Sequence, residues 1–184
     1  AIETRGGLPR KERRFRVVPQ SITAEAVLAK HEGRSLVVCN TVDRAIGTYE
    51  ALVRAGCRPI PFSAADLAPL YASLRSSRDA QEHQCLLDRA IDAVRERHLS
   101  ATASEPWLML LHSRFESPHR QVKEGLLRVL WGPSADPRQA SPSLIVVATQ
   151  VVEVGLDISS NVLHTEMAPA ASILQRAGRC ARYP

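Results

Sequence analysis

Three short apolar runs stand out along the chain: "SLVVC" (35–39), "WLMLL" (107–111) and "SLIVVA" (143–148). None of them alternates between apolar and polar residues. Continuous runs of this length are typical of strands that are covered on both faces, as in a parallel sheet. Two weaker strand candidates are "FRVV" (15–18) and "NVLHTEM" (161–167).

Helical periodicity follows the first two apolar runs. Apolar residues recur with helical spacing from Val42 to Val53, and Gly56 then predicts a stop. A second apolar stripe runs from Val122 to Leu130 and ends at "WGP". Strands that alternate with helices predict an α/β fold with an open, mostly parallel sheet and helices on both faces.

The stretch 61–105 interrupts this alternation. It contains a further amphipathic pattern near 79–98, with apolar positions from Leu86 to Val94. We therefore predict a helical insertion at one edge of the sheet. The segment 132–143 is predicted to be a polar surface loop.

Composition narrows the classes of protein that this chain can represent. Its 184 residues fit one domain, and 45% of them are apolar, as in ordinary globular proteins. A net charge of +5 fits a polyanionic partner such as nucleic acid. The sequence has no membrane-length apolar run and no apolar stretch of a signal peptide, so we expect a cytoplasmic protein without a membrane partner. Scattered cysteines and histidines without ligand spacing predict no metal site.

Polar residues follow each of the three apolar runs. They are "NTV" (40–42), "HSRF" (112–115) and "TQVVEVGLD" (149–157). Because ligands bind beyond the carboxyl ends of parallel strands, we expect these segments to meet at one functional edge. Polar loops are also ordinary at the end of any sheet, so the pattern alone leaves both interpretations open.

The segment "QRAGRCAR" (175–182) carries three arginines. If it were helical throughout, Gln175, Gly178, Arg179 and Arg182 would share a sector of about 80°, and Arg176 would point to one side. A glycine within a helix costs about 1 kcal/mol relative to alanine, which indicates a close approach at Gly178. The arginine face could bind phosphate oxygens, or it could simply be solvated.

Two motifs of a complete nucleotide site are missing from the sequence. It contains no G-x-x-x-x-G-K-[ST] loop to hold phosphates and no D-E-x-[DH] motif to hold magnesium. If the arginines do bind a nucleotide, the chain supplies half of the site. We therefore expect the chain alone to be inactive in ATP hydrolysis.

The ordered motifs resemble a known family. "TQVVEVGLD" and "QRAGRCAR" resemble motifs V and VI of superfamily 2 helicases. Together with "VVCNTVDRA" (37–45), "LLHSRFESPHR" (110–120) and "TEMAPAASILQRAGR" (165–179), they resemble the CRISPR-associated helicase of type I systems. The resemblance implies a second RecA-like helicase domain over 35–184, which contains the insertion and is incomplete at its C-terminal end. Residues 1–34 would form its strand and helix lead-in.

The resemblance also implies an activity and a set of partners. The domain would belong to an ATP-dependent single-stranded DNA translocase in CRISPR antiviral defence. A first RecA-like domain would bind most of the ATP and Mg²⁺, and a CRISPR surveillance complex would recruit the enzyme. The equivalent domain of another superfamily 2 DNA or RNA helicase is one alternative. A non-catalytic module that binds nucleic acid or protein is another.

Site residues follow from the same resemblance, position by position. Arg179 and Arg182 match the arginines that reach ATP across the cleft and stabilise charge on the transferred phosphate. The positions implied near the nucleotide, or coupling it to the DNA, are Gln175, Gly155 and Asp157. The positions implied to hold the DNA backbone are Asn40, Thr41, His112, Ser113, Arg114, Thr149 and Gln150, whose donors suit contacts without sequence specificity.

Overall fold

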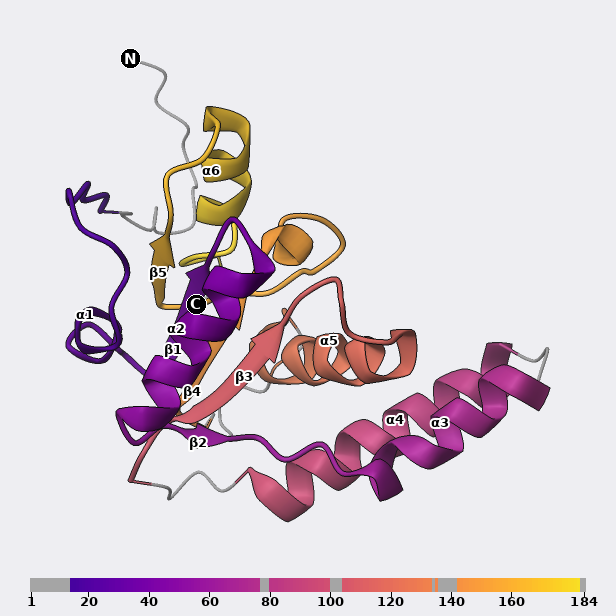
Figure 1. The fold of residues 1–184 in the computed structure, drawn as a ribbon. Coiled ribbons are helices and arrows are strands. Elements are labelled where there is room, and N and C mark those ends of the chain that lie inside the picture. Colours follow the sequence, from indigo (N-terminus) through magenta and orange to yellow (C-terminus); the bar gives the residue numbers. More distant parts are fainter. Residues whose placement is uncertain (1–13, 77–79, 100–103, 134, 136–141, 183–184) are drawn as a thin grey trace, which may run out of the picture.

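The structure is a computed structural model that describes residues 14–76, 80–99, 104–133, 135 and 142–182 (Figure 1). Its core is a five-stranded sheet in the order β2-β3-β4-β1-β5. The strands are β1 (Arg34–Val38), β2 (Arg58–Pro59), β3 (Trp107–Leu111), β4 (Leu144–Ala148) and β5 (Val162–Thr165). Every pairing is parallel, which confirms the predicted sheet.

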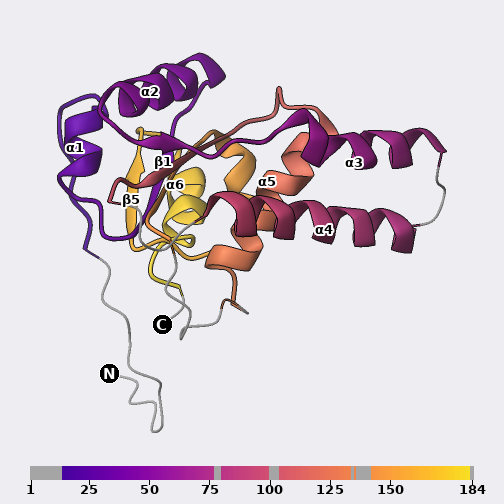
Figure 2. The same ribbon diagram turned by 90° about the horizontal axis from the view of Figure 1, so that it is seen from below.

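Six α-helices and one short 3₁₀ helix surround the described sheet. They are α1 (Ala24–Leu28), α2 (Val42–Arg54), α3 (Ala64–Ser76), α4 (Ala80–His98), α5 (Ser117–Trp131), the 3₁₀ helix η1 (Gln150–Val152) and α6 (Ala170–Ala177). Figure 2 shows α1 and α2 on one side of the sheet and α5 with the α3–α4 pair on the other. Helices thus cover both faces, as the sequence predicts.

Alternation of the buried side chains explains why the strand sequences are continuously apolar. Val37 and Cys39 pack in a cluster with residues of α1 and α2. Leu36 and Val38 pack in a second cluster with residues of α3, α4 and α5. Each central strand therefore needs apolar side chains on both faces, and all five residues of β4 are buried.

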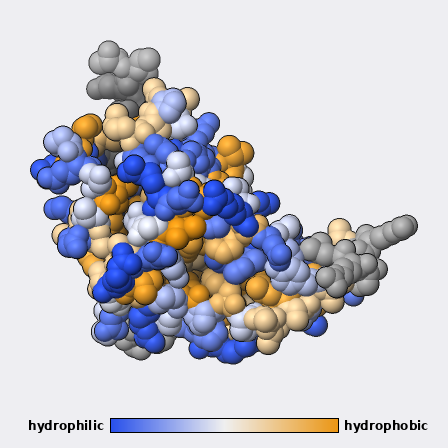
Figure 3. Space-filling view, in the orientation of Figure 1, coloured by the Kyte–Doolittle hydropathy of each residue, from blue (hydrophilic) through white to orange (hydrophobic). Residues whose placement is uncertain are grey.

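The insertion is a helical hairpin made of α3 and α4, which extends away from the sheet (Figure 1). It leaves the edge strand β2 and returns to β3, and α4 packs against α5. The helix predicted near 79–98 is confirmed, whereas α3 is missing from the sequence prediction. Alanines at 64, 65, 68 and 72 are exposed, so α3 lacks a clear polar face, and apolar residues extend along the hairpin in Figure 3.

Outside the sheet, the N-terminal segment and the loop 132–143 differ in how far the structure describes them. The weak strand candidate 15–18 is wrong, because these residues form no strand and Phe15 and Val17 are 71% and 81% exposed. Four residues without a neighbouring strand gain neither hydrogen bonds nor burial. In the lead-in, residues 24–28 form α1, while residues 1–13 lie outside the described part, as does most of the predicted loop 132–143.

No helix among the described residues combines the length and the apolar character needed to cross a membrane.

Candidate functional site

The strand register brings the predicted polar loops to one edge of the sheet. Val38 pairs with Ala148 and with Thr165, and Leu111 also pairs with Ala148, so four strands end at the same level. The segments that follow them lie near α6 and η1, in the upper half of Figure 1. The structure therefore places the three predicted segments at a common edge, together with the residues after β5.

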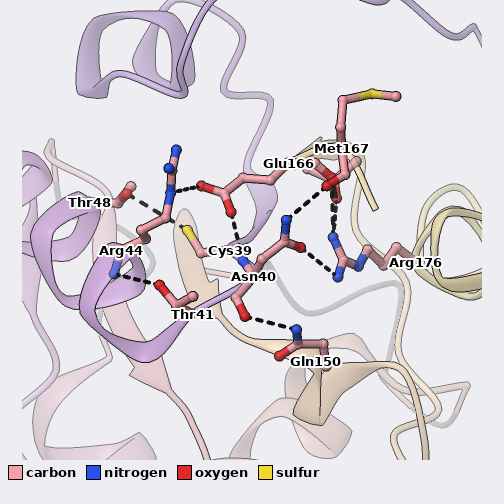
Figure 4. Close-up of polar contacts among 10 residues, drawn as sticks. Cys39, Asn40, Thr41, Arg44, Thr48, Gln150, Glu166, Met167 and Arg176 are labelled. Atoms are coloured by element: carbon pink, nitrogen blue, oxygen red, sulfur yellow. Dashed lines mark hydrogen bonds and ion pairs between the residues drawn. The ribbon is translucent and has the colours of Figure 1, made fainter. Parts of the chain in front are cut away.

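Asn40, two residues beyond the end of β1, is a hydrogen-bonding centre of this edge (Figure 4). Its backbone N–H donates to Glu166 Oε2 at 2.7 Å, and its carbonyl accepts from Gln150 Nε2 at 2.9 Å. Its side-chain Nδ2 donates to the Met167 carbonyl at 2.8 Å, and its Oδ1 accepts from Arg176 Nη2 at 3.1 Å. Both backbone groups and both side-chain groups of Asn40 are therefore engaged within the chain.

Arg176 lies at the other end of this network, and its burial was not predicted from the sequence. The helical projection points it to one side of the helix, and there its side chain is only 1% exposed. Its Nε donates to Glu153 Oε1 at 2.8 Å and its Nη1 donates to Thr165 Oγ1 at 2.9 Å. Nη1 also donates to the Glu166 carbonyl at 3.2 Å. Sequence reasoning missed this role, although an arginine that is buried needs a carboxylate partner and Glu153 stands in the neighbouring motif.

The remainder of the arginine segment leaves the helix. α6 ends at Ala177 with Gly178 as its C-cap, and Cys180 then forms a parallel bridge with Ser160. Arg179 and Arg182 therefore do not share a helical face, and the predicted helical arginine face is wrong. A Cβ on Gly178 would have backbone atoms of Leu174 and Gln175 as its three nearest neighbours. The glycine therefore gives no sign of another segment pressing against it.

Arg179 and Arg182 also contact the segment 149–157. Arg179 donates from Nε to the Val152 carbonyl at 3.2 Å and from Nη2 to the Glu153 carbonyl at 2.9 Å. Arg182 pairs with Asp157 at 2.6 Å. With the Arg176–Glu153 pair, all three arginines of "QRAGRCAR" thus bind the segment predicted to be motif V.

The remaining predicted nucleotide-side residues lie at the surface. Gln175 is exposed on α6, and Asp157 has 51% of its side chain exposed. Gly155 is exposed with a φ of 79°, a left-handed conformation that glycine adopts without strain. Its carbonyl accepts from Arg128 at 3.3 Å, which ties this turn to α5.

The residues after β3 form a loop above a buried lysine. His112 is buried and stacks on Phe115 with ring centroids 4.2 Å apart, while Ser113 and Arg114 are exposed. Beneath them, Lys123 Nζ donates to the Leu110 carbonyl at 2.8 Å and lies 3.5 Å from the centre of the Phe115 ring. Burial lowers the pKa of Lys123 to about 7. Burial, together with the charge of Lys123, also lowers the pKa of His112.

The predicted backbone-contact residues differ in their accessibility. Thr41 is exposed as the N-cap of α2, where its Oγ1 accepts from the backbone N–H of Arg44. Thr149 is buried, and its N–H donates to the Leu111 carbonyl at 3.2 Å. Gln150 is exposed. Arg114 pairs with the exposed Asp43 at 3.0 Å.

The side chains at this edge include several hydrogen-bond donors. In the described residues, no group of three or more His, Cys, Asp or Glu side chains could hold a metal. Guanidinium and amide groups instead offer hydrogen-bond donors that match phosphate oxygens.

A family model described as "CRISPR-associated nuclease/helicase Cas3, C-terminal" matches residues 86–184, more than half of the chain. The chain belongs to this Cas3 family. The resemblance drawn from the motifs is thereby confirmed, and the chain represents a Cas3 C-terminal helicase domain.

Curated relatives agree with this membership. The "CRISPR-associated endonuclease/helicase Cas3" of Thermus thermophilus is 32% identical over 147 residues, covering 79% of this chain and 15% of the relative. The protein with the same description from Escherichia coli is 29% identical over 136 residues, covering 71% of this chain and 15% of the relative. The chain thus spans about 15% of the length of these Cas3 proteins.

Solved Cas3 structures confirm the RecA-like fold. "Crystal structure of T. fusca Cas3" matches with a TM-score of 0.56 at 26% identity, covering 90% of this chain and 14% of that one. "Crystal structure of T. fusca Cas3-ATP" matches with a TM-score of 0.55 at 25% identity, covering 96% and 17%. A chain in "CRISPR RNA-guided surveillance complex, pre-nicking" gives a TM-score of 0.54 at 26% identity, covering 91% and 15%.

Proposed function

We propose that this domain is the second motor domain of an ATP-dependent single-stranded DNA translocase that acts in CRISPR defence. The observation that carries the proposal is the contact of all three arginines, Arg176, Arg179 and Arg182, with the segment 149–157. That segment begins at the same sheet edge as the predicted DNA-facing loops. A nucleotide-facing element and a DNA-facing edge thus form one hydrogen-bonded unit.

On the nucleotide side, Arg179 and Arg182 would act as arginine fingers. Arg179 binds two neutral carbonyls, and Arg182 binds Asp157 with 42% of its own side chain exposed. A phosphate oxygen would form charge-assisted bonds that are stronger than those to carbonyls, so Arg179 can exchange its partners when ATP arrives. Positive charge placed there would stabilise the charge that develops during phosphoryl transfer. Gln175, Gly155 and Asp157 would border the same nucleotide.

The P-loop and the magnesium ligands would come from a first RecA-like domain, because this sequence contains neither motif. Mg²⁺ would neutralise phosphate charge when bound there. A T. fusca Cas3 structure described with ATP supports nucleotide binding in a relative of this chain. The domain's own residues would supply the half of the site that closes over the phosphates.

On the DNA side, the exposed residues would make the direct backbone contacts. These are Thr41, Ser113, Arg114 and Gln150, which present hydroxyl, guanidinium and amide donors. The buried His112 and Thr149 would support them from below. Closure of the cleft over ATP would move these donors along the strand, and hydrolysis would release them.

The match to a chain in a surveillance-complex structure supports a CRISPR complex as partner for the full protein. The test of the proposed function compares full-length protein with the isolated 184-residue chain in ATP hydrolysis. Single-stranded DNA should stimulate the full protein, and single-stranded RNA of the same sequence should stimulate it less. The isolated chain should hydrolyse no ATP but bind DNA weakly and with strong salt dependence. Robust hydrolysis by the isolated chain, or equal stimulation by RNA, would contradict the proposal.

A further inference from the structure

We propose that Arg176 is a positioning residue that transmits movement of the arginine segment 175–182 to the DNA-facing loops. In this proposal Asn40 connects Arg176 to these loops and does not itself contact phosphate. This inference rests on the proposed motor function and deepens it. It concerns a buried arginine that no ATP phosphate needs to touch. Its role follows from which segments it connects.

The contacts of Arg176 join α6 to three other segments. Its three side-chain nitrogens donate to Glu153 in the segment 149–157, to Thr165 and Glu166 at the end of β5, and to Asn40 at the end of β1. The guanidinium is planar and holds its donors in a fixed fork. A displacement of α6 that carries this fork must therefore move these partners together or break the bonds.

The burial of Arg176 distinguishes it from the other two arginines. Its side chain is 1% exposed, whereas the side chain of Arg182 is 42% exposed and Arg179 is partly buried. An unpaired buried charge is costly, which favours keeping Arg176 paired with Glu153 when α6 moves. Arg179 and Arg182 can exchange partners for phosphate, while Arg176 keeps its partners and transmits the movement.

The engagement of Asn40 within the chain decides its part in the linkage. Its Nδ2 donates one hydrogen to the Met167 carbonyl and its Oδ1 accepts from Arg176, so both ends of the amide are fixed by this network (Figure 4). Asn40 instead passes the connection outward through its carbonyl to Gln150 and through its N–H to Glu166. Gln150 is exposed and could face DNA directly.

The second connection from Asn40 runs through Glu166 to the positively charged side chain of Arg44. Glu166 binds the Nε of Arg44, whose side chain is 56% exposed on the first turn of α2. Arg44 stands close in sequence to Thr41, the exposed N-cap of the same helix. The linkage therefore runs from a buried arginine beside the nucleotide-facing segment to two surface donors, Gln150 and Arg44.

The experiment uses full-length protein and measures ATP hydrolysis as a function of single-stranded DNA concentration. Asn40→Ala and Arg176→Lys should each lower the maximal DNA-stimulated rate about tenfold, with less than about a threefold change in the half-saturating DNA concentration. A direct phosphate contact predicts the reverse for Asn40→Ala, namely an unchanged maximum and a raised half-saturating concentration. That result, or wild-type curves for both variants, would overturn the inference.

Controls separate this inference from misfolding and from the proposed function. Thermal unfolding is measured for each variant. If Arg176→Lys fails to fold, Thr165→Val takes its place, because it removes one Arg176 partner with little change of shape, and it should lower the same maximum. Arg54→Lys, on the exposed last turn of α2, is the matched control with an expected wild-type curve. Loss of hydrolysis in Arg179→Ala would uphold the proposed function whatever Asn40→Ala shows.

Discussion

The guanidinium of Arg176 donates to the carboxylate of Glu153 at 2.8 Å, and the two side chains are only 1% and 9% exposed. This pair connects α6 to the turn that follows η1. It joins the two segments whose sequences resemble motifs V and VI. We therefore expect the stability of the domain and the arrangement of this sheet edge to depend on the same ion pair.

Removal of one partner should destabilise the domain strongly. Glu153→Ala leaves the Arg176 charge buried without its carboxylate, and breaking a buried pair in this way costs about 3 to 5 kcal/mol. Urea denaturation of the isolated chain measures the free energy of unfolding. Arg54→Ala, at an exposed pair 4.0 Å from Glu50, should change it by less than about 0.5 kcal/mol. A decrease in the free energy of unfolding below about 1 kcal/mol in Glu153→Ala would contradict a stabilising role for the Arg176–Glu153 pair.

Lys123 should give the free energy of unfolding a distinctive pH dependence. Burial lowers its pKa in the folded chain from 10.5 to about 7, so between these values the unfolded chain holds more protons. Stability therefore rises with pH in this window, by up to about 1.4 kcal/mol per pH unit. Below about pH 7 both states are protonated at Lys123, and its contribution no longer changes.

Lys123→Met should remove that rise, while Lys30→Met, at an exposed lysine, should keep it. Urea denaturation at pH values from 7 to 9 provides the comparison. Parallel stability curves for wild type and Lys123→Met would contradict the buried, easily deprotonated state of this lysine.

Asp43 should weaken DNA binding through its contact with Arg114 at 3.0 Å. Both side chains are well exposed, so the carboxylate competes with phosphate for the guanidinium and repels the backbone charge. Asp43→Asn should tighten binding of single-stranded DNA by about threefold at low salt, and the gain should shrink at high salt.

Fluorescence anisotropy with labelled single-stranded DNA tests this prediction. Asp92→Asn on α4 is the matched control, because Asp92 also pairs with an arginine on an exposed face but lies on the insertion hairpin. Weaker binding by Asp43→Asn would mean that the ion pair positions Arg114 productively and does not compete with DNA.

The sheet could be predicted from the sequence because its strands obey one local rule. Strands covered on both faces need continuous apolar residues, and "WLMLL" corresponds to β3 residue for residue. α3 escaped prediction because its exposed alanines give no polar face. The strand at 15–18 was wrong because an apolar run without a neighbouring strand has nothing to pair with.

The candidate site was only partly predictable, for a tertiary reason. Parallel strands bring their carboxyl ends together, so the convergence of Asn40 and Gln150 followed from the fold. The burial of Arg176 did not, because it depends on the end of α6 at Ala177 and on the position of Glu153. A helical projection cannot show where a helix ends, or which carboxylate from another part of the chain pairs with one of its arginines.

Arg179 offers the most direct test of the motor proposal. Full-length wild-type and Arg179→Ala proteins are compared for DNA-stimulated ATP hydrolysis and for single-stranded DNA binding, with Arg54→Ala as the control. We expect a loss of hydrolysis of at least about 10³-fold in Arg179→Ala, with DNA affinity within about threefold of wild type. Hydrolysis at the wild-type rate in Arg179→Ala would contradict it.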